Sequence, residues 1–245
     1  MPTSTGFDPI DAIALGLFLL AWLVHSLLVS RLSTRRATLS HAMLEHRLRW
    51  MRNAVRHEGR IADAAIQNSL QQGVLFFAST SILVIGGLLA ALGAAEQAVA
   101  VLGELPMAST DTRLEWELKV LLVVGIVTYA FFKFAWSYRL FNYVIILIGA
   151  APDPGRSDAG PDDAELEAAA TRLGRLHAVA AYHFTSGIHA YFHALSAMAW
   201  LLSPWAFIGA TLLVSGVLYR RAFNSRFLAI LVGRDGAADA AEPRV

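Results

Sequence analysis

The chain contains no cysteine, and only two of its 20 basic residues, Lys119 and Lys133, are lysines. Without cysteine it can form no disulfide, no thiolate nucleophile and no cysteine-ligated zinc or iron–sulfur site. Charged residues make up only 16% of the sequence, compared with about 25% in an ordinary soluble domain. Hydrophobic residues make up 56% and the mean hydropathy is +0.51. This composition excludes an ordinary soluble domain.

Signatures of the common enzyme classes are also missing from the sequence. It contains no Walker loop, no HExxH, no GxSxG and no nucleotide-binding fingerprint. No cleavable signal peptide is recognisable, because the first eleven residues carry neither lysine nor arginine. We therefore favour a non-enzymatic protein with no catalytic residue, no cofactor and no nucleic-acid partner.

Long apolar stretches make up most of the sequence: 10–29, 70–93, 118–149 and 178–219. Each exceeds or approaches the roughly 20 residues that a helix needs to cross a bilayer. The pattern predicts an all-α membrane protein built as a four-transmembrane-helix bundle. The predicted crossings are 10–29, 70–93, 118–140 and 196–219, in a single domain of residues 1–235 that is followed by a flexible tail, 236–245.

The charges between the apolar stretches predict an orientation. The gap 30–69 holds eight arginines, whereas the gap 94–117 holds only Arg113. Because basic loops stay in the cytoplasm, residues 30–69 are expected on the cytoplasmic side of a bacterial inner membrane. Four crossings then place the C-terminal tail outside, although it carries Arg220, Arg221, Arg226 and Arg234. Since Pro204 divides the last stretch, five crossings with the tail inside are the alternative.

The gap 30–69 also predicts a basic amphipathic helix. Leu44, Leu48, Met51 and Val55 recur at intervals of four, three and four residues, which defines one apolar stripe. Arginines cover the rest of this helix. It could lie on anionic lipid or pack on its own bundle with the arginines in water. The third and fourth stretches are longer than a bilayer is thick, so cytoplasmic helical extensions are expected as well.

Cations near these extensions suggest a site for an anion. Lys133 and Arg139 lie in an apolar run without an obvious acidic partner, and a charge at membrane depth usually has a reason to be there. The predicted anion- or lipid-binding residues are Lys133, Arg139, Asn142, Arg60, Arg56 and Arg52. The alternative is that the cations only extend to the headgroups or pair within the protein.

Histidines offer a second kind of site. His189 and His193 are four residues apart and share one face of a helix, and His25 near the end of the first stretch could join them. This pattern is compatible with a metal ion or a haem. Matched ligands on facing helices are not identified, however, so ordinary hydrogen-bonded histidines are the favoured interpretation.

Several segments resemble a catalogued family. These are residues 60–94, 116–152 with its AFFKF–WS–R–NY block, and 218–226. They are similar to a family of uncharacterised membrane proteins, domain of unknown function 599, over roughly residues 10–232. The resemblance implies a multi-pass helical protein of the bacterial inner membrane, but no activity or substrate. The family pattern usually has arginine at the position of His189, which weakens a metal role there.

Together these features predict an inner-membrane protein that binds an anionic lipid or another anion near the cytoplasmic side. It would act as a scaffold or within an oligomer, because small residues in 76–93 allow helices to pack closely. Its partners would be membrane lipids and other copies of the chain or other membrane proteins. A channel or small-solute transporter, and a haem- or metal-binding redox protein, are the two alternatives.

Overall fold

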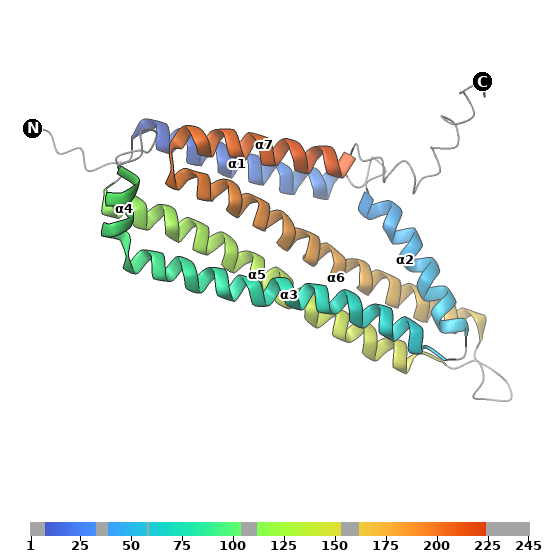
Figure 1. Cartoon of the computed structure of the whole chain (residues 1–245). Coiled ribbons are helices and arrows are strands. Elements are labelled where there is room, and N and C mark those ends of the chain that lie inside the picture. The colour runs from blue at the N-terminus through green and yellow to red at the C-terminus, as the bar shows by residue number, and fades with distance from the viewer. Residues whose placement is uncertain (1–7, 33–38, 58, 104–111, 153–161, 224–245) are drawn as a thin grey trace, which may run out of the picture. The chain divides into compact units, whose positions relative to one another are not determined.

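The computed structural model of the chain (Figure 1) describes residues 8–32, 39–57, 59–103, 112–152 and 162–223. Every regular element in these ranges is helical, which confirms the predicted all-α class. The helices are α1 (Pro9–Leu32), α2 (Leu39–Arg56), α3 (Ile61–Gly93), α4 (Ala95–Gly103), α5 (Arg113–Ala150), α6 (Asp163–Met198) and α7 (Pro204–Phe223), and a 3₁₀ turn, Ala199–Leu201, precedes α7. The predicted tail, 236–245, and Arg226 and Arg234 lie outside the described residues.

Three of the described helices are long and apolar enough to cross a membrane, namely α1 over Pro9–Ser26, α3 and α5. They coincide with the first three predicted crossings. Large apolar side chains are exposed along them, such as Leu20 at 61%, Leu83 at 76% and Phe132 at 65%. A water-soluble protein rarely exposes so much apolar surface. This exposure therefore agrees with a membrane protein whose helices face lipid.

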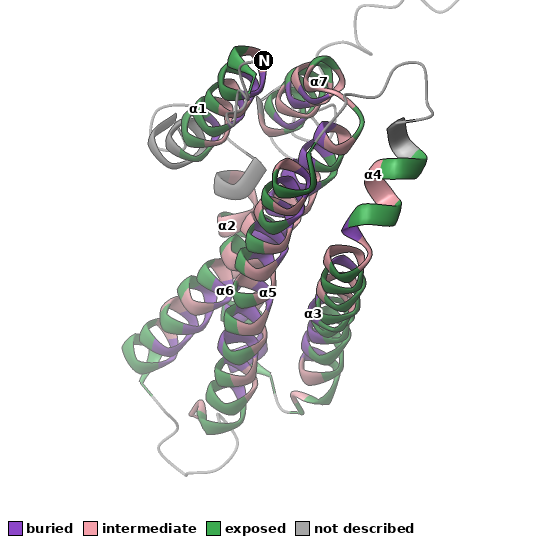
Figure 2. Ribbon diagram, turned by 90° about the vertical axis from the view of Figure 1, so that its left-hand side faces the viewer, coloured by how far each residue is buried: buried purple, intermediate pink, exposed green. Residues whose placement is uncertain are grey.

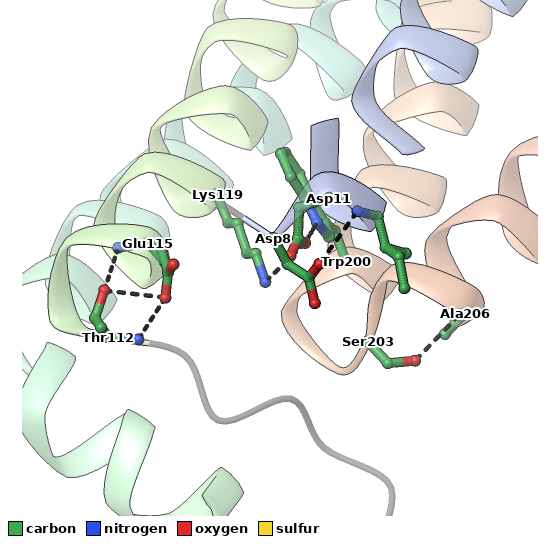
Figure 3. Close-up of polar contacts among 9 residues, drawn as sticks. Asp8, Asp11, Thr112, Glu115, Lys119, Trp200, Ser203 and Ala206 are labelled. Atoms are coloured by element: carbon green, nitrogen blue, oxygen red, sulfur yellow. Dashed lines mark hydrogen bonds and ion pairs between the residues drawn. The ribbon is translucent and has the colours of Figure 1, made fainter. Parts of the chain in front are cut away.

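The last apolar stretch is divided between two helices. α6 ends at Met198, and α7 begins at Pro204 after the 3₁₀ turn. The Ser203 hydroxyl caps α7 by accepting a hydrogen bond from the Ala206 backbone N–H at 3.1 Å (Figure 3). Proline suits the first helical position, where no N–H is needed. The predicted segment 196–219 thus contains a turn. α7 does not belong to the three helices that are long and apolar enough to cross a membrane, so its crossing stays a prediction.

Other helices also begin at capping residues. Thr112 and Glu115 form a reciprocal capping box at the start of α5: the Thr112 backbone N–H donates to Glu115 Oε2 at 2.7 Å, and the Glu115 N–H donates to Thr112 Oγ1 at 3.4 Å (Figure 3). The side chains of Asp8 and Asp162 accept hydrogen bonds at the starts of α1 and α6. These caps satisfy backbone donors that have no partner inside the helix.

The contacts divide the chain into two units. Unit 1 comprises 1–31, 79–131 and 187–220, and unit 2 comprises 32–78, 132–186 and 221–245. Figure 2 shows that buried residues follow one side of each long helix while intermediate and exposed residues cover the rest. α3, α5 and α6 contribute residues to both units.

Unit 1 contains a buried ion pair. Lys119 Nζ lies 3.5 Å from Asp11 Oδ1, and the Lys119 side chain is 0% exposed. The indole N–H of Trp200 donates to the same carboxylate oxygen at 2.5 Å, and Lys119 lies 5.4 Å from the centre of the Trp200 ring (Figure 3). Trp200 stacks on the buried Phe207, which in turn contacts Phe18 of α1. One cluster therefore joins α1, α5, the 3₁₀ turn and α7.

These contacts fix the directions of the helices in unit 1. Asp11 lies in the first turn of α1, Lys119 lies near the start of α5, and Trp200 precedes the start of α7. The starts of α1, α5 and α7 therefore meet at one end of unit 1. Arg113 joins Glu96 at 2.7 Å, so α4, which follows the end of α3, lies at the start of α5. α6 also ends here, because Trp200 follows it directly.

In unit 2, α2 confirms the predicted amphipathic helix but shows which way its apolar stripe faces. Met51 and Val55 are buried in a core with Val144 and Ile148 of α5. The α6 side of this core consists of Leu166, Ala169, Ala170 and Leu173. The stripe therefore packs on the protein's own helices, as in the second of the two predicted alternatives. The exposed residues of α2 include Arg49, Arg52 and Arg56.

Candidate functional site

The helices of unit 2 surround a half-open pocket of about 350 Å³. Its lining residues come from α2, α3, α5 and α6: Met43, His46, Arg47, Trp50, Leu70, Val74, Phe141, His177, Ala181, Phe184 and Thr185. Most of these side chains are apolar or aromatic. Arg47 is the one member of this lining set with a permanent charge. A mostly apolar pocket with a few placed polar groups is typical of ligand sites.

Arg47 reaches the pocket because of its place on α2. It lies three residues after Leu44 and four before Met51, so it borders the apolar stripe that packs on the bundle. Burial lowers the pKa of its guanidinium, and its Nε is buried without a hydrogen-bond partner. None of the described carboxylates forms an ion pair with it, in contrast to Arg52 and Arg56 on the same helix. Arg47 is thus a partly buried cation without a counter-charge in the described part of the chain.

His177 of α6 is the second polar group of the pocket. It is only 4% exposed, and both of its ring nitrogens lack a hydrogen-bond partner among the described residues. Its ring lies between those of Trp50, at 5.4 Å, and Phe141, at 5.2 Å, both in edge contact. Burial, followed by the nearby charge of Arg47, lowers the pKa of His177 to about 4. The imidazole is therefore neutral at pH 7, with one N–H to donate.

A hydrogen bond to Asp63 fixes the indole side chain of Trp50. Its indole N–H donates to Asp63 Oδ1 at 2.6 Å. Asp63 is buried, and this bond directs its carboxylate to Trp50 at the start of α3. The indole wall of the pocket is therefore fixed between α2 and α3. Neither Asp63 nor any other described carboxylate lines the pocket.

The structure places all six predicted anion-binding residues in unit 2 but not in this pocket. Arg52 Nε pairs with Glu167 Oε1 at 2.7 Å. Arg56 lies 3.6 Å from Asp163 and 3.9 Å from Glu167. These exposed pairs join α2 to α6. They pair these arginines with carboxylates of the protein, and binding of an external anion by Arg52 and Arg56 stays a prediction.

Arg60 donates hydrogen bonds to backbone carbonyl groups. Its guanidinium donates to the carbonyl oxygens of Ile148 at 2.9 Å and Ala151 at 2.8 Å, and it also contacts the carbonyls of Pro152 and Val55. Ile148 lies in the last turn of α5, and Ala151 and Pro152 follow its end. Carbonyls at a helix end lack helical partners, and a cation is favourable there. Arg60 therefore caps α5 from the start of α3.

The remaining predicted residues, Lys133, Arg139 and Asn142, are on α5. Arg139 Nε donates to Tyr143 Oη at 2.7 Å, and its guanidinium lies over the same ring. Asn142 Oδ1 accepts a hydrogen bond from Gln71 Nε2 at 2.6 Å, which joins α5 to α3. Lys133 also takes part in an interaction within the protein. Their binding of an anion stays a prediction.

The three histidines that were considered for a metal do come together, in unit 1. His25 Nε2 lies 3.2 Å from His189 Nδ1, and the rings of His25 and His193 are 5.9 Å apart. His193 Nδ1 contacts the His189 carbonyl oxygen at 2.8 Å, and its ring stacks on Trp22. No group of three or more metal-ligating side chains was found among the described residues. In this geometry the histidines contact one another and the backbone.

Arg47 and His177 were not selected from the sequence as site residues. For Arg47, a helical wheel contains the necessary information: Arg47 borders the stripe, whereas Arg49 lies on the opposite face. For His177, the sequence shows only a histidine in an apolar helix. Its meeting with Arg47 depends on how α2 packs against α6, which no local pattern reveals.

Comparisons with known proteins give a family but no function. No curated protein and no solved structure matches the chain. The sequence model of a family described as "Protein of unknown function, DUF599" matches residues 13–227, and the chain belongs to this family.

Proposed function

We propose that this chain is a non-enzymatic multi-pass protein of the bacterial inner membrane that binds an anionic amphiphile in the pocket of unit 2. The observation that carries the proposal is Arg47. It is a partly buried guanidinium without a counter-charge among the described residues, and it lines an otherwise apolar pocket. Removing a charge from water is costly unless an opposite charge or hydrogen bonds compensate it. A bound anion would supply both.

The chemistry of the pocket favours an amphiphile over a small water-soluble anion. Leu70, Val74, Phe141 and Phe184 provide apolar walls beside the guanidinium. A guanidinium pairs with carboxylate or phosphate oxygens through two parallel N–H bonds. A molecule with an apolar chain and a carboxylate or phosphate head would therefore contact the apolar walls with its chain and the Arg47 guanidinium with its head.

The expected location of the pocket agrees with this role. The arginine-rich gap 30–69 contains α2, and basic segments of this kind lie at the cytoplasmic face, where anionic lipids attract them. A scaffold or an oligomer that responds to bound lipid would fit such a site. Arg52 and Arg56 would then hold α2 in place through Glu167 rather than bind lipid themselves.

The first prediction concerns lipid retention. The wild-type chain, Arg47→Gln and Arg49→Gln would be extracted from bacterial membranes in a mild detergent and compared by native mass spectrometry. We expect the wild type to retain an anionic amphiphile and Arg47→Gln to lose it, because the guanidinium is its counter-charge. Arg49 is exposed on the same helix, so its variant should retain the ligand.

Circular dichroism and thermal unfolding would establish that the three proteins are equally folded. If folded Arg47→Gln retained anionic amphiphiles as well as the wild type does, the pocket would not be their site. The proposal would then be wrong.

A further inference from the structure

We infer that the ligand of the pocket is a single-chain amphiphile whose head carries one negative charge, that is, a fatty carboxylate, with Arg47 and His177 as its head-group ligands. This inference rests on the proposed function and makes it more specific. Three features of the pocket support it: its charge, its size and the chemistry of His177.

The charge of the pocket matches a monoanion. Arg47 is the only lysine, arginine, aspartate or glutamate among the described lining residues, so the lining carries one permanent positive charge. A head with a single negative charge neutralises it. A head with two charges, such as a phosphate monoester, would leave one charge uncompensated in an apolar pocket, which is unfavourable. A carboxylate head meets this condition, whereas a phosphate monoester does not.

The size of the pocket favours one chain over two. Its volume of about 350 Å³ lies near the lower end of the range of roughly 300–1,000 Å³ seen for ligand pockets. The apolar wall continues to Leu70, which is 45% exposed, so it reaches the surface of unit 2. A single chain can lie along this wall and leave the pocket there. Two acyl chains on a glycerol would not both fit inside.

His177 adds selectivity for an oxygen acceptor. Its imidazole is buried between Trp50 and Phe141, with no hydrogen bond from either ring nitrogen to a described residue. A neutral imidazole has one N–H, which a carboxylate oxygen can accept. Arg47 and His177 line the same pocket, so one head group can contact both. The guanidinium would bind both oxygens, and the imidazole would donate to one of them.

The experiment is a binding titration on the full chain in nanodiscs of zwitterionic phosphatidylcholine. The probes are palmitate, hexadecanol with the same chain and no charge, phosphatidylglycerol, and inorganic phosphate as a competitor. We expect about one palmitate per chain. The wild type should bind hexadecanol at least about tenfold more weakly than palmitate, and Arg47→Gln should bind palmitate at least about tenfold more weakly than the wild type does. In both cases a charge-assisted pair is lost. Arg49→Gln is the matched control and should bind palmitate normally.

His177→Phe separates hydrogen bonding from packing. Phenylalanine keeps an aromatic ring between Trp50 and Phe141 but cannot donate. His177→Phe should weaken the binding of palmitate severalfold and leave the weak binding of hexadecanol unchanged. Equal losses for both probes would show that His177 only shapes the wall, and its role as a head-group ligand would be refuted.

The other outcomes distinguish this inference from the proposed function. If phosphatidylglycerol binds in an Arg47-dependent manner and palmitate does not, the fatty-carboxylate inference is overturned while the anionic-amphiphile function stands. If inorganic phosphate binds through Arg47 and neither amphiphile does, the site takes a free anion, and both are overturned. If no anionic probe depends on Arg47, both are likewise overturned.

Discussion

Lys119 and Arg47 are both cations removed from water, and their surroundings differ. Lys119 is fully buried and lies 3.5 Å from Asp11, while Trp200 donates to the same carboxylate. Arg47 has no carboxylate partner among the described residues and borders a pocket. The first arrangement neutralises its charge within the protein. The second leaves the charge without a carboxylate partner among the described residues, and this contrast is the basis for our proposal that Arg47 binds an anion.

A prediction at the residue scale concerns the buried pair. Asp11→Asn should destabilise the protein by about 3–5 kcal/mol, because Lys119 would be left as a buried charge without its partner. Thermal unfolding in detergent would measure the loss. The double variant Asp11→Asn with Lys119→Met removes both charges and should recover much of the stability. A single variant as stable as the wild type would show that the pair is unimportant.

Residue partners were the least predictable part of the structure. Asp11 and Lys119 stand at the margins of two apolar stretches, 108 positions apart (119 minus 11). Nothing in either stretch indicates that they meet. Likewise, the sequence gives no sign that Arg60 caps the end of α5. Such pairings depend on tertiary packing, whereas the caps at Thr112 and Ser203 are local and recognisable.

At the scale of single elements, the position of α2 depends on Gly174 of α6. A methyl group at this position would lie 2.7 Å from Leu48 Cδ2 and 3.2 Å from Leu48 Cα. α2 therefore approaches α6 closely, and any larger residue at this position would require Leu48 and the backbone of α2 to shift. Since Arg47 precedes Leu48 and His177 follows Gly174 by less than one turn, the same contact sets the spacing of the two pocket residues.

A second prediction tests this contact. Gly174→Ala should destabilise unit 2 by about 1–3 kcal/mol, because overpacking forces the backbone of α2 to shift. It should also weaken binding in the pocket. Gly73→Ala of α3 is the matched control: its added methyl group meets nothing within 4 Å, so helix propensity should make it neutral or slightly stabilising. Thermal unfolding would compare them, and equal stability of the two variants would contradict the close approach.

The elements themselves were largely predictable. The spacing of Leu44, Leu48, Met51 and Val55 predicts α2, and the apolar stretches predict the long helices. The sequence left open whether the stripe of α2 faces lipid or protein, because either surface is apolar. The structure places Met51 and Val55 in the core. Local periodicity thus defines the buried face without identifying what covers it.

At the scale of the whole molecule, the directions of the helices in unit 1 bear on the crossing count. α1, α5 and α7 start at the end where Asp11, Lys119 and Trp200 meet, and α3 and α6 end there. Five segments therefore alternate in direction. We propose that this end faces outward, as the charges of the gap 30–69 require. α7 then ends inside, together with Arg220, which agrees with the five-crossing alternative.

This topology predicts the accessibility of single cysteines, and the chain provides a cysteine-free background. In intact bacterial spheroplasts, a membrane-impermeant maleimide should label Glu96→Cys but not Arg220→Cys or Arg52→Cys. After lysis it should label all three, because each position is exposed. Labelling of Arg220→Cys from outside would restore the four-crossing count and contradict the proposal.

Which helices cross the membrane could be predicted only in part. Length and apolarity identify α1, α3 and α5, because a bilayer requires both. α7 is harder, since it begins at Pro204 and carries Arg220 and Arg221 in its last turn. Its direction follows from the contacts of Trp200 and Phe207, which are tertiary.

The most direct measurement is an experimental density map of the chain extracted with its native lipids. Our account predicts density for an elongated molecule in the pocket of unit 2, with its head against the Arg47 guanidinium and His177, and the same map without this density for Arg47→Gln. A map in which a carboxylate of the protein itself pairs with Arg47 and the pocket holds no such molecule would contradict the account.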